Sequence, residues 1–359
     1  MKYFHIIVAV LLSLLYLTGS IPPTERYNIW ITIFIIPFAM VANTVLLIIT
    51  AIRRKRSGLF YLVPMVIGFP YMLSTIGVKS YFQRPNPSAT SFTLLDYNLS
   101  TFTMKGQFSS PKIDSATELY DLILNPETDV QCYQEFVNYP WSKNGNIIQR
   151  LNDLNRHFYF SMEPETAHTD WSRLGTLIVS KFPIIAQGDV LEGMAGFNRV
   201  SFVDIVVQSD TVRIVNVHLH SMGLGRFDPR ERSRLRDMGR ATEIILSKLK
   251  EGVFERSKQA KQLSQFVESS PYPVVCAGDF NDMPYAYTYR YLRKYMKNAF
   301  EESGKGFGFT YNGGTLRVLR IDNQFYRGPL RSVELQTRYD LPYTDHFPVQ
   351  GKYELLKSE

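Results

Sequence analysis

Long apolar runs near the amino terminus impose the strongest constraint on how this chain can fold. One extends from Ile29 to Ile52 and another from Leu59 to Val78, and the basic cluster Arg53–Arg56 lies between them. Each run is long enough to cross the ~30 Å hydrocarbon core of a bilayer as a helix. The prolines inside them would disfavour helices in water but are tolerated in membrane helices. The sequence therefore predicts that both runs are transmembrane helices.

An earlier apolar run, from Phe4 to Leu17, allows two interpretations. Lys2 ahead of it and the small residues Gly19 and Ser20 after it also describe a cleavable signal peptide. We favour an uncleaved helix because no clear small-x-small cleavage site follows. The predicted membrane region is 1–80, with transmembrane helices near 4–21, 29–52 and 59–78, and a linker follows at 81–90.

The basic cluster Arg53–Arg56 sets the expected orientation of this region. Positive charges that flank membrane helices remain in the cytoplasm, so the third helix should lead out of it. We therefore expect a multi-pass protein of the cell membrane with its following domain extracytoplasmic, on the periplasmic side where a periplasm exists. This orientation holds whether or not the first run is cleaved.

The net charge of +7 comes from the membrane region. Residues 1–83 hold seven Lys and Arg and one acidic residue, which leaves 33 of the 40 basic and 32 of the 33 acidic residues for the remainder. That balance of +1 gives no reason to expect a nucleic-acid-binding surface. Cys132 and Cys276 lie in apolar, strand-like runs and are expected to be buried core residues. Whether they form a disulfide is left open by the sequence.

Strand-like and helical segments alternate from Ser91 onward. The predicted strands are Phe92–Leu95, Val130–Tyr133, Thr176–Val179, Arg199–Val207, Val212–Leu219, a run beginning at Val274, Arg317–Phe325, Val333–Arg338 and Pro348–Tyr353. The predicted helices are Ala116–Leu124, Ile147–His157, Pro229–Lys250 and Ser257–Val267. Periodicity and β-branched content support these assignments. The mixture indicates a layered α/β domain at 91–359.

Polar side chains stand at or just beyond the ends of these segments. In the stretch Pro273–Pro284, a buried strand leads into Asp279 and Asn281, which lie on one side of an extended backbone. A carboxylate and an amide so placed can hold a water, a metal ion and a phosphate oxygen, although an ordinary turn is the alternative. The other candidates are Asn98, Glu135, His218, Asp322, Asp345 and His346. Together they supply the oxygen ligands, carboxylate base and imidazoles that phosphoester chemistry requires.

In order and spacing, this set resembles the endonuclease/exonuclease/phosphatase superfamily over roughly Ser91 to Leu355. The matching motifs are Tyr97-Asn98, Gln134-Glu135, Gly175–Pro183, Asn216–Leu219, Gly278–Asn281, Arg320–Asp322 and Thr344–His346. Three apolar helices ahead of such a domain also resemble a membrane-anchored bacterial branch. Thr344, Val217 and Asn323 depart from the commoner residues of the motifs, and none of these changes removes a catalytic atom.

The resemblance implies an α/β fold, an α+β four-layer sandwich in which two packed mixed β-sheets are flanked by helices. It implies a divalent cation, Mg²⁺ or Mn²⁺, bound by Glu135 with Asn98 and Asp345 beside it. Asp279 would activate the attacking water and Asn281 would hold it. The resemblance further assigns phosphate-oxygen binding to His218 and His346, and the orientation of His346 to Asp322.

The implied function is a membrane-anchored, metal-dependent phosphoesterase, whose substrate could be nucleic acid, a phospholipid headgroup or a small phosphoester. The alternative is a catalytically retired, membrane-tethered binding module of the same fold. No protein partner is indicated. A predicted helix after Pro284 carries Tyr287, Tyr291 and Tyr295 on one face, with Arg290, Arg293, Lys294 and Lys297 nearby. These residues could stack on bases, face lipid headgroups or pack on the sheet beneath.

Overall fold

A computed structural model describes residues 2–24, 28–79, 86, 90–102, 116–162, 173–191, 198–222, 238–313 and 317–356. The chain divides into two compact units. The first comprises Met1–Ile76, Ser221–Lys261 and Asp282–Lys294, and the second comprises Gly77–His220, Gln262–Asn281 and Tyr295–Glu359.

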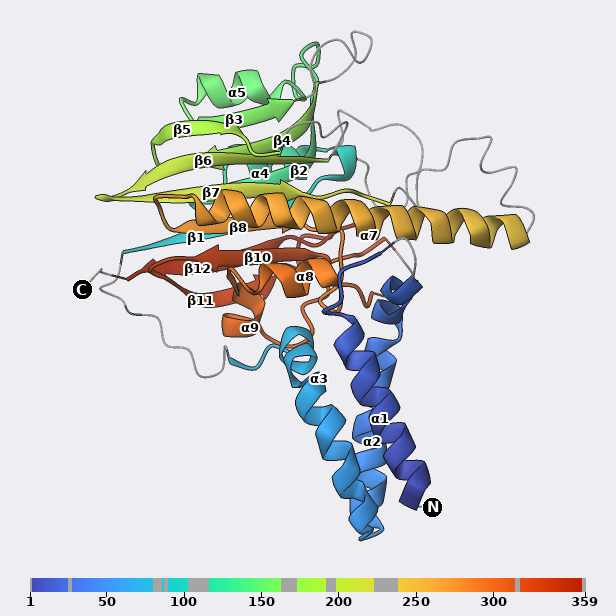
Figure 1. Cartoon of the computed structure of the whole chain (residues 1–359). Helices are drawn as coiled ribbons and strands as arrows, with labels where there is room; N and C mark the ends of the chain where they lie inside the picture. Colours follow the sequence, from blue (N-terminus) through green and yellow to red (C-terminus); the bar gives the residue numbers. More distant parts are fainter. Residues whose placement is uncertain are drawn as a thin grey trace. The chain divides into compact units, whose positions relative to one another are not determined.

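The second unit is built on two six-stranded mixed sheets (Figure 1). Their strand orders are β11-β12-β1-β2-β4-β3 and β5-β6-β7-β8-β10-β9. Two neighbouring pairs are parallel, β1 (Ser91–Asn98) with β2 (Val130–Asn138) and β7 (Asp210–His218) with β8 (Val274–Asp279); the other described pairs are antiparallel. The remaining strands are β3 (His157–Met162), β4 (Arg173–Ser180), β5 (Ile184–Asp189), β6 (Arg199–Val207), β9 (Lys297–Asn298), β10 (Asp322–Arg327), β11 (Leu330–Thr337) and β12 (Val349–Leu355).

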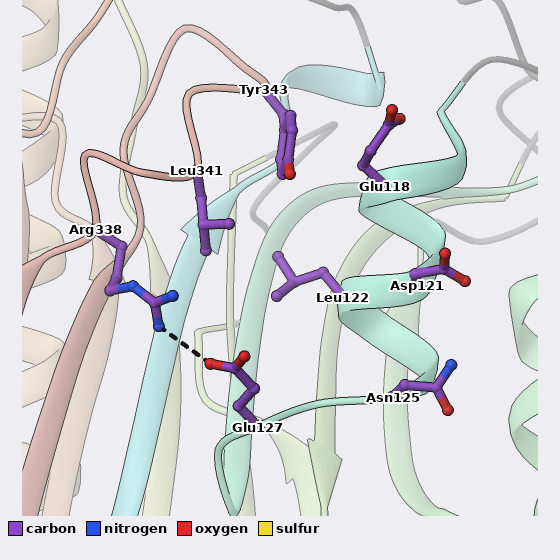
Figure 2. Close-up of a pocket in the computed structure, with 8 residues that line it drawn as sticks. All are labelled: Glu118, Asp121, Leu122, Asn125, Glu127, Arg338, Leu341 and Tyr343. Carbon is purple, nitrogen blue, oxygen red and sulfur yellow. Dashed lines mark ion pairs between the residues drawn. The ribbon is translucent and has the colours of Figure 1, made fainter.

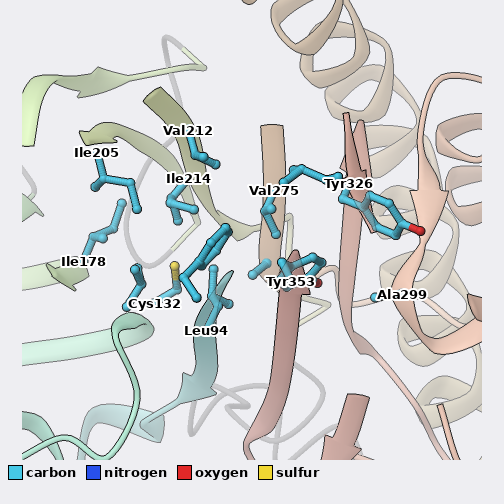
Figure 3. Packing of buried hydrophobic residues seen from close by; sticks show 14 of the residues in the cluster. Leu94, Cys132, Ile178, Ile205, Val212, Ile214, Val275, Ala299, Tyr326 and Tyr353 are labelled. Carbon is cyan, nitrogen blue, oxygen red and sulfur yellow. The ribbon is translucent and has the colours of Figure 1, made fainter. Parts of the chain in front are cut away.

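Apolar side chains from both sheets form one core between them (Figure 3). Leu94 and Cys132 come from the first sheet and Ile214 and Val275 from the second, and all four are completely buried. Burial of a side chain of this size contributes about 1.5–3 kcal/mol, so this interface holds the sheets together. Cys132 and Cys276 are buried and free, which confirms their predicted core role and settles that they form no disulfide.

Helices cover the outer faces of the two sheets. α4 (Thr117–Leu124) and α5 (Ile147–Asp153) share one buried cluster with side chains of β1, β2 and β4 in the first sheet. The carboxyl-terminal part of α7 (Met238–Glu268) covers the second sheet, because the ring of Phe266 lies 5.2 Å from that of Phe202. The predicted four-layer sandwich is confirmed. A short helix, α9 (Ala299–Ser303), and a 3₁₀ turn, η4 (Ser100–Phe102), complete this unit.

The first unit contains the amino-terminal helices. They are α1 (Lys2–Thr18), η1 (Asn28–Phe34), α2 (Ile36–Ile52), η2 (Arg56–Tyr61) and α3 (Leu62–Thr75), and α8 (Tyr287–Leu292) lies in the same unit. Among the described residues, Arg56–Thr75 is long and apolar enough to cross a membrane. Asn28–Phe34 and Ile36–Ile52 would make a second span despite the 55° bend between them, whereas Lys2–Thr18 is apolar but shorter. The three membrane crossings remain a prediction.

Three of the predicted helices were wrong in extent. The helix predicted for Ile147–His157 ends at Asp153, because Asn155 adopts a left-handed φ of 52° that stops it. β3 then begins at His157, where an aromatic run pairs with β4. One continuous α7 replaces the two helices predicted around Gly252, and the predicted stretch before Met238 lies outside the described residues.

Strand boundaries also differed from expectation at two places. β5 was not predicted, because the side chains of Ile184–Asp189 are exposed or half-buried and the strand is defined by its pairing with β6. The strand predicted from Arg317 begins only at Asp322, where pairing with β8 starts. The helix predicted after Pro284 ends at Leu292, so Tyr295 lies beyond it.

Candidate active site

The predicted site residues meet where several strands end, all within the second unit. In the second sheet, His218 of β7 lies in register with Asp279 of β8, and Asp279 lies in register with Asp322 of β10. In the first sheet, Asn98 ends β1 and lies in register with Gln134, beside Glu135. Strand pairing therefore gathers residues that are far apart in the sequence. Asn281 follows β8 and Asp345 and His346 precede β12.

Asp279 is the hub of the cluster and is almost fully buried. It accepts hydrogen bonds from the Asn98 side-chain amide at 3.0 Å and from the Asn281 backbone N–H at 2.7 Å. The Nε2 atoms of His218 and His346 each lie 3.8 Å from its Oδ2. Burial and the nearby Asp322 raise the pKa of Asp279 to about 6, although the two imidazoles and the Asn281 N–H oppose this rise. The carboxylate is thus poised to accept a proton near neutral pH.

His346 and Asp322 form a buried pair. Nδ1 of His346 lies 2.9 Å and 3.1 Å from the two carboxylate oxygens of Asp322. Burial alone would lower the pKa of His346, but Asp322, Asp279 and Asp345 together raise it well above its ordinary value. The imidazole is therefore held protonated, with Nδ1 directed at Asp322 and Nε2 directed toward Asp279. The Thr310 hydroxyl accepts hydrogen bonds from the backbone N–H groups of Ile321 and Asp322 and so fixes the start of β10.

Glu135 is presented by a bulge in β2. Tyr133 pairs with Leu177 and Phe136 with Gly175, so Gln134 and Glu135 oppose a single residue of β4. Glu135 has a φ of 49°, a left-handed conformation that few residues other than glycine adopt without cost. The bulge directs its carboxylate toward the cluster, where Oε1 lies 3.9 Å from Nε2 of His218.

Asn98 and Asp345 are joined by residues that sequence reasoning missed. The Asn98 side-chain oxygen accepts from the backbone N–H of Ser100 at 2.9 Å, and the Ser100 hydroxyl donates to Asp345. The Thr344 hydroxyl donates to the backbone oxygen of Asn98 at 2.9 Å. The only sequence signal for Ser100 was its position just after the Tyr97-Asn98 motif, which is too weak to distinguish it from a loop serine.

Tyr311 was also missed, and it lies against the cluster. Its ring centroid is 5.3 Å from that of His346 in an edge-on arrangement. The pKa of Tyr311 is raised by burial and then by the charges of Asp345, Asp279 and Glu135. The charges of these three carboxylates therefore act on the same phenol.

Buried amides join the two sheets beneath the cluster. The Gln134 side-chain N–H group donates to the Asn216 side-chain oxygen at 2.8 Å. Asn216 in turn donates to the backbone oxygens of Tyr133 at 3.0 Å and Leu177 at 3.1 Å. Both amides belong to motifs identified in the sequence, and each lies within two residues of a candidate site residue. They fix the spacing between Glu135 on one sheet and His218 on the other.

Gly278 allows the backbone of β8 to lie close to the backbone of β7 and to the Gln134 amide between the sheets. Its φ is 140°, and a Cβ atom there would lie 2.1 Å from the backbone oxygen of Val217 and 2.8 Å from the side-chain nitrogen of Gln134. A side chain would therefore collide with β7 and with the amide between the sheets. Only glycine satisfies both the conformation and the space.

A pocket in the same unit lies apart from this cluster. Figure 2 shows it between α4 and the segment that carries Arg338, Leu341 and Tyr343, with an ion pair of 3.5 Å between Arg338 and Glu127. None of the candidate residues lines it. Its acidic side chains are opposed by a single arginine, and we assign it no part in the site.

Comparison with known proteins identifies the architecture. Residues 97–346 match the model of the endonuclease/exonuclease/phosphatase family. The chain belongs to this family. The predicted superfamily is thus confirmed. Residues 1–75 match a second model, described as a domain of unknown function, and no curated protein matches the chain.

Solved structures with the same fold include other members of the family. An endonuclease/exonuclease/phosphatase from Beutenbergia cavernae has a TM-score of 0.52 at 15% identity, with 74% of this chain and 72% of that chain covered. A family protein from Leptotrichia buccalis has a TM-score of 0.51 at 13% identity, covering 74% and 100%. D. rerio TDP2 complexed with single strand DNA product has a TM-score of 0.50 at 14% identity, covering 74% and 99%. At these identities the likeness shows the fold.

The oxygen donors of this family member suit a divalent cation. Glu135 and Asp345 supply carboxylates and Asn98 an amide oxygen, a set that Mg²⁺ and Mn²⁺ prefer and zinc does not. A second group, Asp279, Asp322 and His346, has ligand atoms within 4.8 Å of one another. In that group Nδ1 of His346 is hydrogen-bonded to Asp322, which leaves Nε2 as the ring nitrogen that could face a cation. That Glu135, Asn98 and Asp345 bind the cation stays a prediction.

Proposed function

We propose that this protein is a membrane-anchored phosphoesterase that requires a divalent metal ion and uses water as its nucleophile. The observation that carries the proposal is the placement of two imidazoles 3.8 Å from the same buried carboxylate, Asp279. A carboxylate with a pKa of about 6 can accept a proton from water, while imidazoles beside it can neutralise phosphate oxygens. A binding module without catalytic activity would not need this combination of groups.

Each residue of the cluster has a role in this proposal. Asp279 takes the proton from the attacking water, and Asn281 orients that water beside it. As the water oxygen bonds to phosphorus, the bond from phosphorus to the leaving oxygen breaks, and that oxygen takes a proton from solvent. His346, held protonated by Asp322, donates to a non-bridging phosphate oxygen, and His218 contacts the same developing charge. Glu135, Asn98 and Asp345 would hold Mg²⁺ or Mn²⁺, which would supply electrostatic stabilisation to the phosphoryl group when bound.

The site supports hydrolysis of a phosphoester, and three classes of substrate fit that reaction. D. rerio TDP2 was solved with a single strand DNA product, which supports nucleic acid as one candidate. A phospholipid headgroup and a small soluble phosphoester are the others. We propose that the domain lies outside the cytoplasm. The position of Arg53–Arg56 between apolar runs and the exposed apolar side chains of α1–α3 support this placement.

Hydrolysis of chromogenic esters by the purified full-length chain tests the reaction. Bis-p-nitrophenyl phosphate and p-nitrophenyl phosphate report diester and monoester cleavage, and Mg²⁺ should be required for either. Asp279→Asn should abolish turnover, whereas Asp189→Asn, a change of an exposed carboxylate, should not. Equal rates for wild type and Asp279→Asn would contradict the proposal.

A further inference from the structure

The segment Asp282–Lys294 follows the candidate site directly in the chain, yet it packs with the amino-terminal helices in the first unit. The Tyr285 hydroxyl lies 3.1 Å from the hydroxyl of Thr75, the last residue of α3. The ring of Tyr285 lies 6.2 Å from that of Tyr71, and the Arg290 guanidinium lies 4.7 Å from the same Tyr71 ring. The segment therefore covers the carboxyl end of α3.

The carboxyl end of α1 meets the same segment. Gly19 follows this helix, and a Cβ atom there would lie 2.7 Å from the backbone oxygen of Tyr285. At the opposite end of the helices, His5 of α1 hydrogen-bonds the hydroxyl of Tyr61 at 2.8 Å, next to the Arg53–Arg56 cluster. Asp282–Lys294 thus lies at the end of the helices that is remote from this cluster.

Between these two ends the helices expose apolar side chains. Phe4, Ile7, Leu11 and Leu14 of α1 and Val63 and Val66 of α3 are all exposed. At 1.5 Å per residue, α1 is about 25 Å long, close to the ~30 Å hydrocarbon core of a bilayer. If this stretch lies in hydrocarbon, then the end covered by Asp282–Lys294 lies at the level of the lipid headgroups.

The charges of the segment suit a position at the level of the lipid headgroups. Arg290, Arg293 and Lys294 are cationic, whereas its single acidic residue, Asp282, is buried and lies 3.3 Å from the Arg256 guanidinium. Nη1 of Arg290 is buried and has no hydrogen-bond partner among the described residues. Lys294 is exposed, with its Nζ 5.6 Å from the ring of Tyr291. Cations beside interfacial tyrosines are typical of segments that contact lipid headgroups.

The tyrosines of the segment disfavour a role in stacking nucleic-acid bases. Tyr287 and Tyr289 are buried, Tyr285 is packed against Tyr71, and the half-buried Tyr291 has its ring 5.5 Å from that of Tyr287. A stacking platform needs exposed ring faces along a groove, and these rings are used in packing within the unit. Of the cations, Lys294 is exposed and Arg290 and Arg293 are half-buried, so part of each charged side chain remains open to a surface of phosphates.

We propose that Asp282–Lys294 is a membrane-interface segment in which Arg290, Arg293 and Lys294 bind the phosphates of anionic phospholipid headgroups. The inference rests on the proposed membrane anchoring. It goes beyond anchoring because it gives the segment that follows Asn281 in the chain its own lipid preference. Each cation near an anionic surface contributes roughly a five-fold increase in the binding constant, so two of them change the docking equilibrium roughly 30-fold.

Depth measurements with a nitroxide on the full-length chain test the proposal. Lys294→Cys carries the label in vesicles of phosphatidylcholine, with or without phosphatidylglycerol, and Val10→Cys on α1 reports whether the helices are inserted. Cys132 and Cys276 are fully buried and burial raises the pKa of both thiols, so they should react slowly. The Lys294→Cys label should become protected from an aqueous nickel chelate when phosphatidylglycerol is present.

Protection of the label by anionic lipid should depend on Arg290 and Arg293. Arg290→Gln together with Arg293→Gln should return the label to water, whereas Lys143→Gln together with Lys258→Gln, a charge-matched control, should not. The inference is overturned if the label on Lys294→Cys stays aqueous in both vesicles while Val10→Cys lies in hydrocarbon. If the label on Val10→Cys is also aqueous, both this inference and the anchoring proposal are wrong. Protection by a short single-stranded DNA, and not by anionic lipid, would overturn it in favour of nucleic-acid binding.

Discussion

Replacing Asn216 by leucine should both destabilise the second unit and impair the site. The change keeps the approximate size of the side chain but removes three buried hydrogen bonds, one from the Gln134 amide and two to the backbone oxygens of Tyr133 and Leu177. The partners remain buried without these bonds, and an unsatisfied buried group costs about 1–3 kcal/mol. Because Gln134 keeps a second acceptor in the backbone oxygen of Cys132, we expect a total loss of about 4 kcal/mol.

Thermal unfolding of the full-length chain in detergent measures this loss. A loss of about 4 kcal/mol should lower Tm by about 8–16 °C, since 1 kcal/mol shifts a domain of 150–250 residues by about 2–4 °C. We also expect kcat to fall by about 10²-fold below the melting range, because a shift of ~1 Å between catalytic groups can cost that much. Glu135 and His218 lie on the two sheets whose spacing Asn216 maintains.

The matched control removes another hydrogen bond between the sheets. The hydroxyls of Thr176 and Ser201 lie 3.0 Å apart and are fully buried. Thr176→Val combined with Ser201→Ala removes both partners, so no group is left unsatisfied and the cost should be near zero to about 1 kcal/mol. If Asn216→Leu has the same Tm as this control variant and retains wild-type kcat, the amides do not set the spacing of the site.

Three further predictions concern the metal, the imidazoles and the topology. Thorough chelation should abolish phosphoester hydrolysis, and Mg²⁺ or Mn²⁺ but not Zn²⁺ should restore it; undiminished turnover by chelated protein would exclude a metal requirement. His218→Ala and His346→Ala should each lower kcat by ~10²-fold or more with an unchanged circular dichroism spectrum, and near-wild-type rates in the folded double variant would refute their roles. A reporter fused after Glu359 should be active as alkaline phosphatase and dark as green fluorescent protein, and the reverse pattern would place the domain in the cytoplasm.

Much of the sandwich could be predicted because its central strands are buried on both faces. β1, β2, β7 and β8 are almost entirely buried, so their β-branched and aromatic runs carry a clear signal. β3 and β5 are edge strands of their sheets and have partly exposed side chains. Their pairing partners, which the sequence does not specify, decide their conformation. Two helices were predicted where α7 is continuous, and Gly252 lies inside it, because a long helix tolerates one glycine.

Candidate site residues could be predicted where they lie in a recognisable motif. They could not be predicted where their role depends on a backbone conformation. Asp279, His346 and Asp322 could be identified as candidates because they belong to motifs whose order and spacing together resemble the family, although each motif alone is a weak signal. The left-handed φ of Glu135 and the role of Ser100 arise from the bulge and the turn after β1, which depend on tertiary pairing. The roles of Gln134 and Asn216 between the sheets likewise appear only once both sheets are formed.

Gly278 limits how this site can diversify. The collision that any Cβ atom would cause there is with the carbonyl of Val217 in the neighbouring strand, and backbone cannot move aside as a flexible side chain can. A saturation library should therefore lose every variant at this position, including alanine, whereas positions on the surrounding loops should tolerate exchange. Variation in what the site accepts must then arise at its rim. The backbone of β8, which carries Asp279, cannot change.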